Sequence, residues 1–180
     1  MTKALLIIDV QVGLFEPTPS PYKSDEVISN INKLTDKARP SKTPIIWIQH
    51  ETPSHEILKF QSSGWKLPNN LNRAESDFYV RKTTPDSFFK TDLLQILTNQ
   101  TVSELVVCGY ATEFCVDTTI RSAAEKGFQI TLVSDTHTTH DKQHAPAEFI
   151  IQHHNATLPN ITSFGVKIKT EQSALVEFAS

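Results

Sequence analysis

Short, continuously apolar runs alternate along this chain with longer segments of helical periodicity. A strand without polar alternation is one that is buried on both faces, and such strands are typical of a parallel sheet covered by helices. The runs expected to form strands are residues 4–8, 44–49, 77–81, 104–108, 128–133 and, as a short last strand, 161–163. The pattern therefore predicts an α/β fold, with three αβα layers and a mostly parallel sheet of about six strands.

Helices are expected where apolar residues recur every three or four positions. These segments are residues 24–39, 91–98, 112–126 and 143–156. Residues 50–76 lack such periodicity, and a loop of this length inside a compact domain is usually functional. No linker or change in composition divides the chain, so we expect one domain over residues 1–180.

The composition excludes several classes of protein. The 180 residues carry a net charge of −3 and are 38% hydrophobic, which argues against a disordered chain and against a nucleic-acid-binding surface. The five glycines are too scattered for a phosphate-binding loop, and the two cysteines form no disulfide framework. The first apolar run ends at Asp9, too early for a signal peptide or a membrane span. We expect a cytoplasmic protein that acts on a small molecule and binds neither nucleic acid nor membranes.

Reactive side chains follow three of the expected strands. In parallel sheets, ligands bind at the carboxyl ends of the strands. Asp9 follows the first strand, Lys82 follows the third, and Cys115 comes shortly after the fourth. Spacing along the sequence does not bring these residues together, but a parallel sheet would. They are therefore the candidate catalytic residues.

Cys115 stands where a strand runs through a tight turn into a helix. If Thr112 caps that helix, Cys115 lies in its first turn, where unpaired amides and the helix dipole favour a thiolate and can hold an oxyanion. The alternative is a buried structural cysteine, a description that fits Cys108, inside a strand, better. Asp9 can likewise be a general base or a loop-capping carboxylate, and Lys82 a charge stabiliser or a solvated strand end.

Three blocks of sequence carry a family resemblance. They are residues 5–11 (LLIIDVQ), 81–88 (RKTTPDSF) and 108–116 (CGYATEFCV). In residue type and order they resemble the isochorismatase-like cysteine hydrolase superfamily, which includes nicotinamidases and N-carbamoylsarcosine amidase. Residues 134–139 and 150–158 also resemble one branch of that superfamily, whose substrates are mostly unassigned.

The resemblance implies an isochorismatase-like (Rossmann-like) fold and a catalytic triad of Asp9, Lys82 and Cys115. In this triad the aspartate takes the thiol proton, the cysteine attacks a carbonyl carbon to form an acyl-enzyme, and the lysine supports the charges. The implied activity is metal-independent hydrolysis of a small amide or related C–N bond. Two alternatives stay open: vinyl-ether hydrolysis of isochorismate, which needs no thiol nucleophile, and a non-catalytic binding member of the fold.

The resemblance also implies details around the nucleophile. It implies a cis peptide between Tyr110 and Ala111, and an oxyanion hole made of the backbone amides of Ala111 and Cys115. It further implies a homo-oligomer, either a dimer or a tetramer, in which a neighbouring subunit completes the pocket. The residues expected to line the substrate pocket are Gln11, Phe15, Trp65, Thr112 and Phe114.

Histidines near the second strand raise the question of a metal. Nicotinamidases of this superfamily hold a metal through an Asp-x-His pair and a later histidine, and residues 48–55 contain no such pair. We therefore expect no metal and no other cofactor. A site built from His50, Glu51 and His55 is the open alternative.

A second set of histidines follows the fifth expected strand. His137, His140 and His144 are spaced superficially like zinc ligands. No cysteine joins them, so a polar loop with helix-capping side chains is the better interpretation. His153 and His154 are adjacent, so a helix would point them in different directions and they are not expected to share a ligand.

Overall fold

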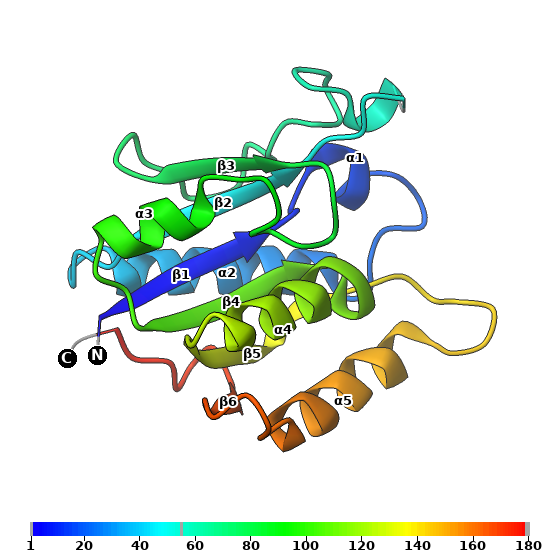
Figure 1. Ribbon diagram of the computed structural model, residues 1–180. Coiled ribbons are helices and arrows are strands. Elements are labelled where there is room, and N and C mark those ends of the chain that lie inside the picture. The colour runs from blue at the N-terminus through cyan, green and yellow to red at the C-terminus, as the bar shows by residue number, and fades with distance from the viewer. Residues whose placement is uncertain (1, 55, 179–180) are drawn as a thin grey trace.

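The computed structural model describes residues 2–54 and 56–178. Its centre is a sheet of six strands, all parallel, in the order β3-β2-β1-β4-β5-β6 (Figure 1). The strands are β1 (Lys3–Ile8), β2 (Ile45–His50), β3 (Phe78–Lys82), β4 (Glu104–Tyr110), β5 (Gln129–Thr138) and β6 (Ile168–Glu171). The α/β fold and the parallel sheet predicted from the sequence are thereby confirmed.

Helices cover both faces of the sheet, which produces the three predicted layers. Helix α2 (Ser24–Ala38) lies on one face, and α3 (Leu93–Asn99) and α4 (Asp117–Glu125) lie on the other (Figure 1). The remaining helical segments are α1 (Val12–Phe15), η1 (Glu56–Leu58), η2 (Thr112–Val116), α5 (Ala147–Thr157) and η3 (Leu158–Asn160). No helix within residues 2–54 and 56–178 is long and apolar enough to cross a membrane.

The apolar run of β1 has no polar alternation because both of its faces are buried. Leu6 and Ile8 pack in the core on the α3 and α4 side, whereas Leu5 and Ile7 pack in the core on the α2 side. Full burial of a side chain of this size stabilises the fold by roughly 1.5–3 kcal/mol. The hydrophobic effect therefore favours β1 in the middle of the sheet, between β2 and β4.

The strand order reverses beside β1, and such a reversal is where an open parallel sheet forms its ligand-binding crevice. From β1 the chain adds β2 and then β3 on one side, and it crosses over to add β4, β5 and β6 on the other. Ile8 pairs with Ile48 of β2 and with Gly109 of β4, so these strands end at nearly the same level. The residues that follow them share one edge of the sheet.

In the last third of the chain, one predicted strand is wrong and one predicted helix starts later than expected. The last strand is not residues 161–163, because β6 pairs with β5 instead. β6 is an edge strand in which only Ile168 is fully buried, so it lacks the continuous apolar run on which the prediction of strands depends. The helix expected from residue 143 starts at Ala147, because Pro146 stands at its N-cap.

Two further differences lie beside the candidate catalytic residues. β5 extends to Thr138 rather than ending at residue 133, and a register shift between Val107 and Gly109 keeps it paired with β4. The added stretch is polar, so hydrophobicity does not reveal it as a strand. The expected helix 112–126 consists of a π-helical turn, η2, followed by α4. Helix α1 was not predicted because it is too short to show helical periodicity.

Candidate active site

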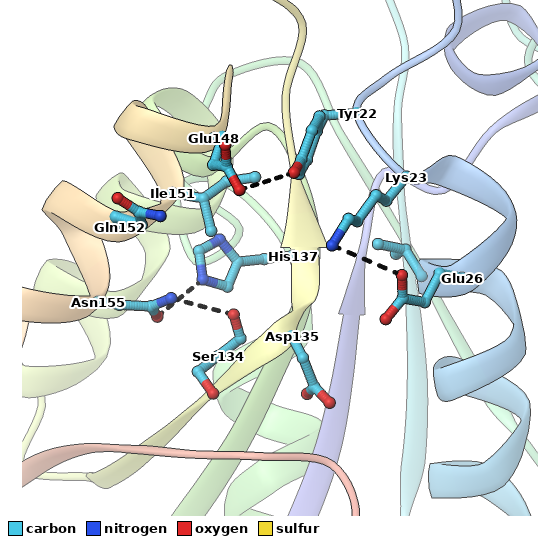
Figure 2. Close-up of a pocket in the computed structure, with 11 residues that line it drawn as sticks. Tyr22, Lys23, Glu26, Ser134, Asp135, His137, Glu148, Ile151, Gln152 and Asn155 are labelled. Carbon is cyan, nitrogen blue, oxygen red and sulfur yellow. Dashed lines mark hydrogen bonds and ion pairs between the residues drawn. The ribbon is translucent and has the colours of Figure 1, made fainter. Parts of the chain in front are cut away.

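A cavity between α2, β5 and α5 contains none of the three candidate catalytic residues. Its volume is about 200 Å³, and its lining includes Tyr22, His137, Glu148 and Asn155 (Figure 2). The candidate catalytic residues meet elsewhere, at the carboxyl ends of the strands, where the order of the sheet reverses. The site is therefore located by its chemistry and not by the shape of this cavity.

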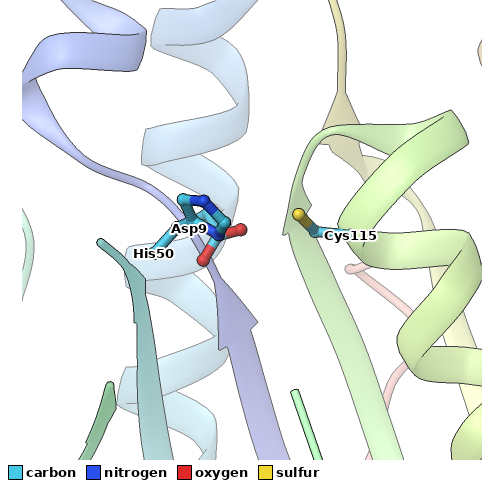
Figure 3. A group of neighbouring side chains, drawn as sticks. All are labelled: Asp9, His50 and Cys115. Atoms are coloured by element: carbon cyan, nitrogen blue, oxygen red, sulfur yellow. The ribbon is translucent and has the colours of Figure 1, made fainter. Parts of the chain in front are cut away.

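Three strand ends bring Asp9, Lys82 and Cys115 together. Asp9 follows β1, Lys82 ends β3, and Cys115 lies in η2, shortly after β4. Lys82 Nζ is 2.7 Å from Asp9 Oδ2, and the two side chains are 0% and 1% exposed. A carboxylate oxygen of Asp9, the Cys115 sulfur and a ring nitrogen of His50 lie within 4.8 Å of one another (Figure 3). The arrangement combines a thiol, a carboxylate, an ammonium and an imidazole in one small space.

Asp9 leaves β1 in a left-handed backbone conformation, with a φ of 52°. Aspartate tolerates this conformation better than most residues do. The Asp9 amide donates to the Ile48 carbonyl at 3.0 Å, which ties the turn to β2. One carboxylate oxygen accepts from Lys82, whereas the other, Oδ1, is buried without a hydrogen-bond partner among the described residues. That oxygen is therefore free to accept a hydrogen bond or a proton.

Lys82 is a buried cation rather than a solvated strand end. Its Nζ donates to Asp9 Oδ2 and to the Thr84 carbonyl, the latter at 3.1 Å, and lies 3.5 Å from His50 Nδ1. Burial disfavours the ammonium, but the pKa of Lys82 is raised overall, chiefly by the negative charge of Asp9. The site therefore contains a fixed positive charge.

Cys115 carries a protonated thiol in the resting site. Burial, and after it the Asp9 carboxylate, raise the pKa of the Cys115 thiol to about 12, although Lys82 acts in the opposite direction. The thiolate expected from a helix start is therefore not the resting state, and Ala111 rather than Thr112 stands at the N-cap of η2. Such a thiol needs a base that takes its proton as it reacts, and Asp9 is within reach.

The turn after β4 presents backbone amides beside the sulfur. The peptide bond between Tyr110 and Ala111 is cis. The Ala111 carbonyl accepts hydrogen bonds from the amides of Phe114 and Val116, both at 3.1 Å, but not from the amide of Cys115 between them. Within the described part of the chain, no backbone carbonyl accepts a hydrogen bond from the Ala111 amide. The oxyanion hole expected from the amides of Ala111 and Cys115 stays a prediction.

Gly109 allows β4 to end this close to β1. Its φ is 121°, and a Cβ atom at this position would lie 2.1 Å from the Ile8 carbonyl oxygen. Glycine alone accepts both the conformation and the close approach of the two backbones. This close contact sets how near the turn that carries Cys115 comes to the strand end that carries Asp9.

Comparison with known proteins places the chain in a family. The family model for the isochorismatase domain matches residues 3–162. The chain belongs to the isochorismatase family. The resemblance recognised in the three sequence blocks is thereby confirmed, and the protein is an isochorismatase-family hydrolase.

Curated relatives of this isochorismatase-family protein include named enzymes. It is 31% identical over 144 residues to streptothricin hydrolase of Streptomyces noursei, a match that covers 80% of the chain but only 57% of the relative. It is 31% identical over 182 residues to an uncharacterised isochorismatase family protein of Bacillus subtilis, covering 97% of the chain and 99% of the relative. A nicotinamidase of Arabidopsis thaliana is 29% identical over 176 residues, which cover 90% of the chain and 81% of the relative.

Solved structures share the whole fold. The crystal structure of an isochorismatase family protein superposes with a TM-score of 0.87 at 36% identity, covering 95% of this chain and 98% of the other. N-carbamoylsarcosine amidase of Thermoplasma acidophilum superposes with a TM-score of 0.83, covering 98% and 99% of the two chains. At 16% identity, the second likeness shows the fold alone.

Gln11 and Phe15, two of the expected pocket residues of this isochorismatase-family protein, are buried. Gln11 Oε1 accepts from the His50 amide at 2.8 Å, and its Nε2 donates to the carbonyls of His50 and Trp65 at 3.0 and 2.9 Å. Gln11 therefore holds the end of β2 in place. Phe15 packs in the core, with its ring edge-on to Tyr110.

The other three expected pocket residues differ in exposure. Thr112 is buried, and its hydroxyl lies 2.8 Å from His137 Nδ1. Trp65 is half-buried and packs edge-on against Phe60. Phe114 is 54% exposed, one residue before Cys115. Of the five, Phe114 is the most exposed.

His50 joins the site through the same feature as Asp9 and Lys82, because it stands at the end of a strand, β2. Burial lowers the pKa of His50, and Lys82 acts in the same direction, so the ring is neutral near pH 7. Aspartate, histidine and cysteine are ligands that zinc accepts. The Lys82 ammonium, however, lies 2.7 Å from Asp9 Oδ2 and 3.5 Å from His50 Nδ1, so it would repel a metal cation bound to this group.

Three residues from the other candidate metal sets contact separate partners: Glu51, His137 and His140. Arg81 engages Glu51 through two hydrogen bonds of 2.8 and 3.1 Å, and His55 lies outside the described residues. His137 and His140 contact different side chains, of η2 and of β4. In the part of the chain that the structure describes, the one group of His, Cys, Asp or Glu with metal-like spacing is the group that contains Cys115.

Proposed function

We propose that this isochorismatase-family hydrolase cleaves a small amide or related C–N bond through an acyl-enzyme on Cys115, without a metal. The observation that carries the proposal is the buried ion pair of Lys82 and Asp9, 2.7 Å apart, beside the protonated thiol of Cys115. The second carboxylate oxygen of Asp9 accepts no hydrogen bond from the described residues. The similarity to a nicotinamidase, an amide-cleaving enzyme by name, supports the choice of bond.

The first half of the reaction forms the acyl-enzyme. The free Asp9 oxygen accepts the thiol proton while the Cys115 sulfur forms a bond to the carbonyl carbon. Negative charge passes from sulfur to the carbonyl oxygen, where the amides of Ala111 and Cys115 donate to it. The C–N bond then breaks, and the leaving nitrogen takes the proton from Asp9 and departs as ammonia or an amine.

The second half hydrolyses the thioester. Asp9, again a carboxylate, accepts a proton from water while the water oxygen attacks the acyl carbon. The S–C bond breaks, the sulfur regains a proton, and a carboxylic acid leaves. Lys82 keeps its charge throughout and holds the carboxylate in position.

The test compares two cysteine variants of the full chain. Cys115→Ala removes the nucleophile and should abolish turnover in a screen of small primary amides and carbamoyl compounds. Cys108→Ala makes the same change at the fully buried thiol of β4 and should retain turnover. Mass spectrometry of wild type treated with p-nitrophenyl acetate should find an acetyl group on Cys115. Unchanged turnover by folded Cys115→Ala would contradict the proposal.

Incubation with isochorismate tests the alternative activity. Vinyl-ether hydrolysis needs no thiol, so it would persist in Cys115→Ala. A wild-type protein that neither turns over an amide nor accepts the acetyl group would favour the non-catalytic alternative.

A further inference from the structure

Two histidines, one in the polar end of β5 and one just after it, contact the turn that leads to Cys115. His140 Nδ1 lies 2.9 Å from the Tyr110 hydroxyl, and His137 Nδ1 lies 2.8 Å from the Thr112 hydroxyl. Ala111, whose amide belongs to the proposed oxyanion hole, lies between the two held residues. The spacing that superficially resembles a zinc site therefore serves two separate side-chain contacts.

The same segment also contacts Glu113. The Thr139 hydroxyl donates to Glu113 Oε1 at 2.9 Å, and Lys142 Nζ lies 3.0 Å from the same oxygen. In the sheet, Gly109 pairs with His137. The end of β5 thus contacts the turn at several consecutive positions, through both backbone and side chains.

The hydrogen bonds around His137 determine which ring nitrogen carries its proton. Asn155 Nδ2 donates to the Ser134 carbonyl at 3.0 Å, so Asn155 Oδ1 is the atom that faces His137 Nε2, also at 3.0 Å (Figure 2). An amide oxygen only accepts, so Nε2 carries the proton and Nδ1 has a lone pair. The Thr112 hydroxyl must therefore donate to His137 Nδ1.

Burial keeps this arrangement in one state. His137 is 2% exposed, and burial lowers its pKa to about 4, so the ring is neutral near pH 7. Because the Thr112 hydroxyl donates its one hydrogen bond to His137, it cannot also donate one to a substrate. As a donor, Thr112 thus anchors the turn, and its place in the substrate pocket stays a prediction.

We propose that His137 is a positioning residue of the active site. It fixes the Thr112 hydroxyl and, through the turn that follows, keeps the amides of the oxyanion hole in place. The inference rests on the proposed function, because an oxyanion forms only if Cys115 attacks a carbonyl carbon. It predicts that loss of the anchor impairs acyl transfer specifically, and does not impair every reaction of the thiol.

Two reagents that react with the same sulfur separate these effects. With p-nitrophenyl acetate, an S–C bond forms at a carbonyl carbon, the C–O bond breaks, and p-nitrophenolate leaves after an oxyanion has formed. With iodoacetamide, an S–C bond forms at a saturated carbon and iodide leaves, without an oxyanion. The ratio of the two rates at Cys115, read by mass spectrometry, therefore reports the oxyanion hole.

Thr112→Val removes the hydroxyl and keeps the shape of the side chain. We expect it to lower the rate of acylation on the order of 10–100-fold while alkylation stays at the wild-type rate. Thr112→Ser should restore the ratio, because serine keeps the hydroxyl. Asn155→Ala removes the acceptor that holds His137 and should lower the ratio in the same direction, so it carries the test if Thr112→Val does not fold.

The matched control is Thr131→Val. Thr131 is a buried threonine of β5, the strand that contains His137, and its hydroxyl donates to Glu104 at 2.9 Å. Its replacement should lower stability but leave the ratio of rates unchanged. If the ratio of acylation to alkylation is unchanged in both Thr112→Val and Asn155→Ala, the role of His137 is overturned while the proposed function stands. Alkylation without any acylation of wild type would overturn the proposed function, and the inference with it.

Discussion

Burial disfavours the charged forms of both Cys115 and Lys82, but the two residues end in different protonation states. The Cys115 thiol keeps its proton because burial and the nearby Asp9 carboxylate both oppose a thiolate. Lys82 keeps its charge because Asp9 lies 2.7 Å away and compensates for the lost water. The resting site is therefore an ion pair beside a neutral thiol, and its chemistry starts when a proton moves.

Replacing Asp9 by Asn should separate the reactivity of the thiol from catalysis. The change removes the negative charge that raises the pKa of Cys115 and leaves Lys82 free to stabilise a thiolate. We expect the midpoint pH of iodoacetamide alkylation at Cys115 to fall below that of wild type. Turnover should fall by about 10²–10⁴-fold, because the general base is lost.

Site-by-site mass spectrometry measures this alkylation, with Cys108 as the internal reference. Burial raises the pKa of Cys108 as well, and no cation among the described residues offsets it, so its labelling should stay slow in both proteins. An Asp9→Asn midpoint equal to or above that of wild type would contradict this electrostatic explanation.

Lys82→Met should destabilise the fold, because it leaves Asp9 as a buried charge without a partner. We expect the free energy of unfolding at pH 7, measured in urea, to fall by about 3–5 kcal/mol. The pKa of Lys82 is raised on folding, so its contribution is fully present below the unfolded pKa of about 10.4. It is lost as pH rises through the higher folded value, so the two proteins should converge in strong alkali.

The double variant Asp9→Asn/Lys82→Met is the control for this effect. It contains no buried charge from the pair, so it should recover part of the stability lost in Lys82→Met. A double variant that is no more stable than the single variant would show that packing of the lysine chain, and not its charge, matters.

At the scale of elements, adjacent strand ends create the site. β2 lies between β1 and β3, so Lys82 reaches past the end of β2 to contact Asp9. On the other side of β1, β4 ends in the close contact at Gly109, and the extension of β5 holds the turn that follows. Each strand end contributes one functional group, and the order of the strands determines which groups meet.

Gly109→Ala should damage both stability and activity. A methyl group there meets the Ile8 carbonyl oxygen at 2.1 Å in a conformation with φ of 121°, so β4 must move away from β1. We expect a loss of at least about 3 kcal/mol in the free energy of unfolding, together with loss of turnover.

Gly127→Ala is the matched control for Gly109→Ala. Gly127 also has a positive φ, 89°, but a Cβ there meets nothing within 4 Å. It should therefore cost only about 1–2 kcal/mol, by thermal or urea unfolding, and leave turnover intact. Equal losses in the two variants would rule out the close contact as the reason for glycine at position 109.

At the scale of the whole molecule, the two ends of the sheet have different roles. The carboxyl ends of the strands carry the candidate catalytic residues. Near the amino end of β3, the Asp77 side chain connects neighbouring elements. Its carboxylate accepts from Arg39, the C-cap of α2, at 2.8 Å, from the Trp47 indole of β2 at 2.9 Å and from the Ala74 amide at 2.9 Å. One buried side chain thus connects a helix, a strand and the long loop.

Asp77→Asn should lower stability without affecting catalysis. Burial raises the pKa of Asp77, but the hydrogen bonds from Arg39 and Trp47 outweigh burial and lower it overall. Its contribution is present above the unfolded pKa of about 3.9 and is lost as pH falls through the lower folded value. We expect a loss of about 2 kcal/mol at pH 7 that fades in acid, measured by urea unfolding across pH. A loss independent of pH, or a loss of turnover, would contradict this role.

The sequence by itself determined the class of fold and pointed to the candidate residues. Short continuous apolar runs that alternate with helical segments indicate strands with two covered faces, which are typical of a parallel sheet between helices. Asp9 and Lys82 are recognisable because a polar side chain directly after such a run falls at the ligand-binding edge of the sheet. The roles within the triad came from the family resemblance and not from spacing.

The tertiary structure alone decided which residues are neighbours and what their surroundings do to them. Asp9 and Lys82 are 73 residues apart in sequence, and no local periodicity encodes the strand order that joins them. The polar end of β5 is a strand only because β4 pairs with it. Its own residues are not apolar, so the sequence predicted a loop at His137. The Cys115 thiol stays protonated because residues distant in sequence exclude water around it, and desolvation is a property of packing that no short segment contains.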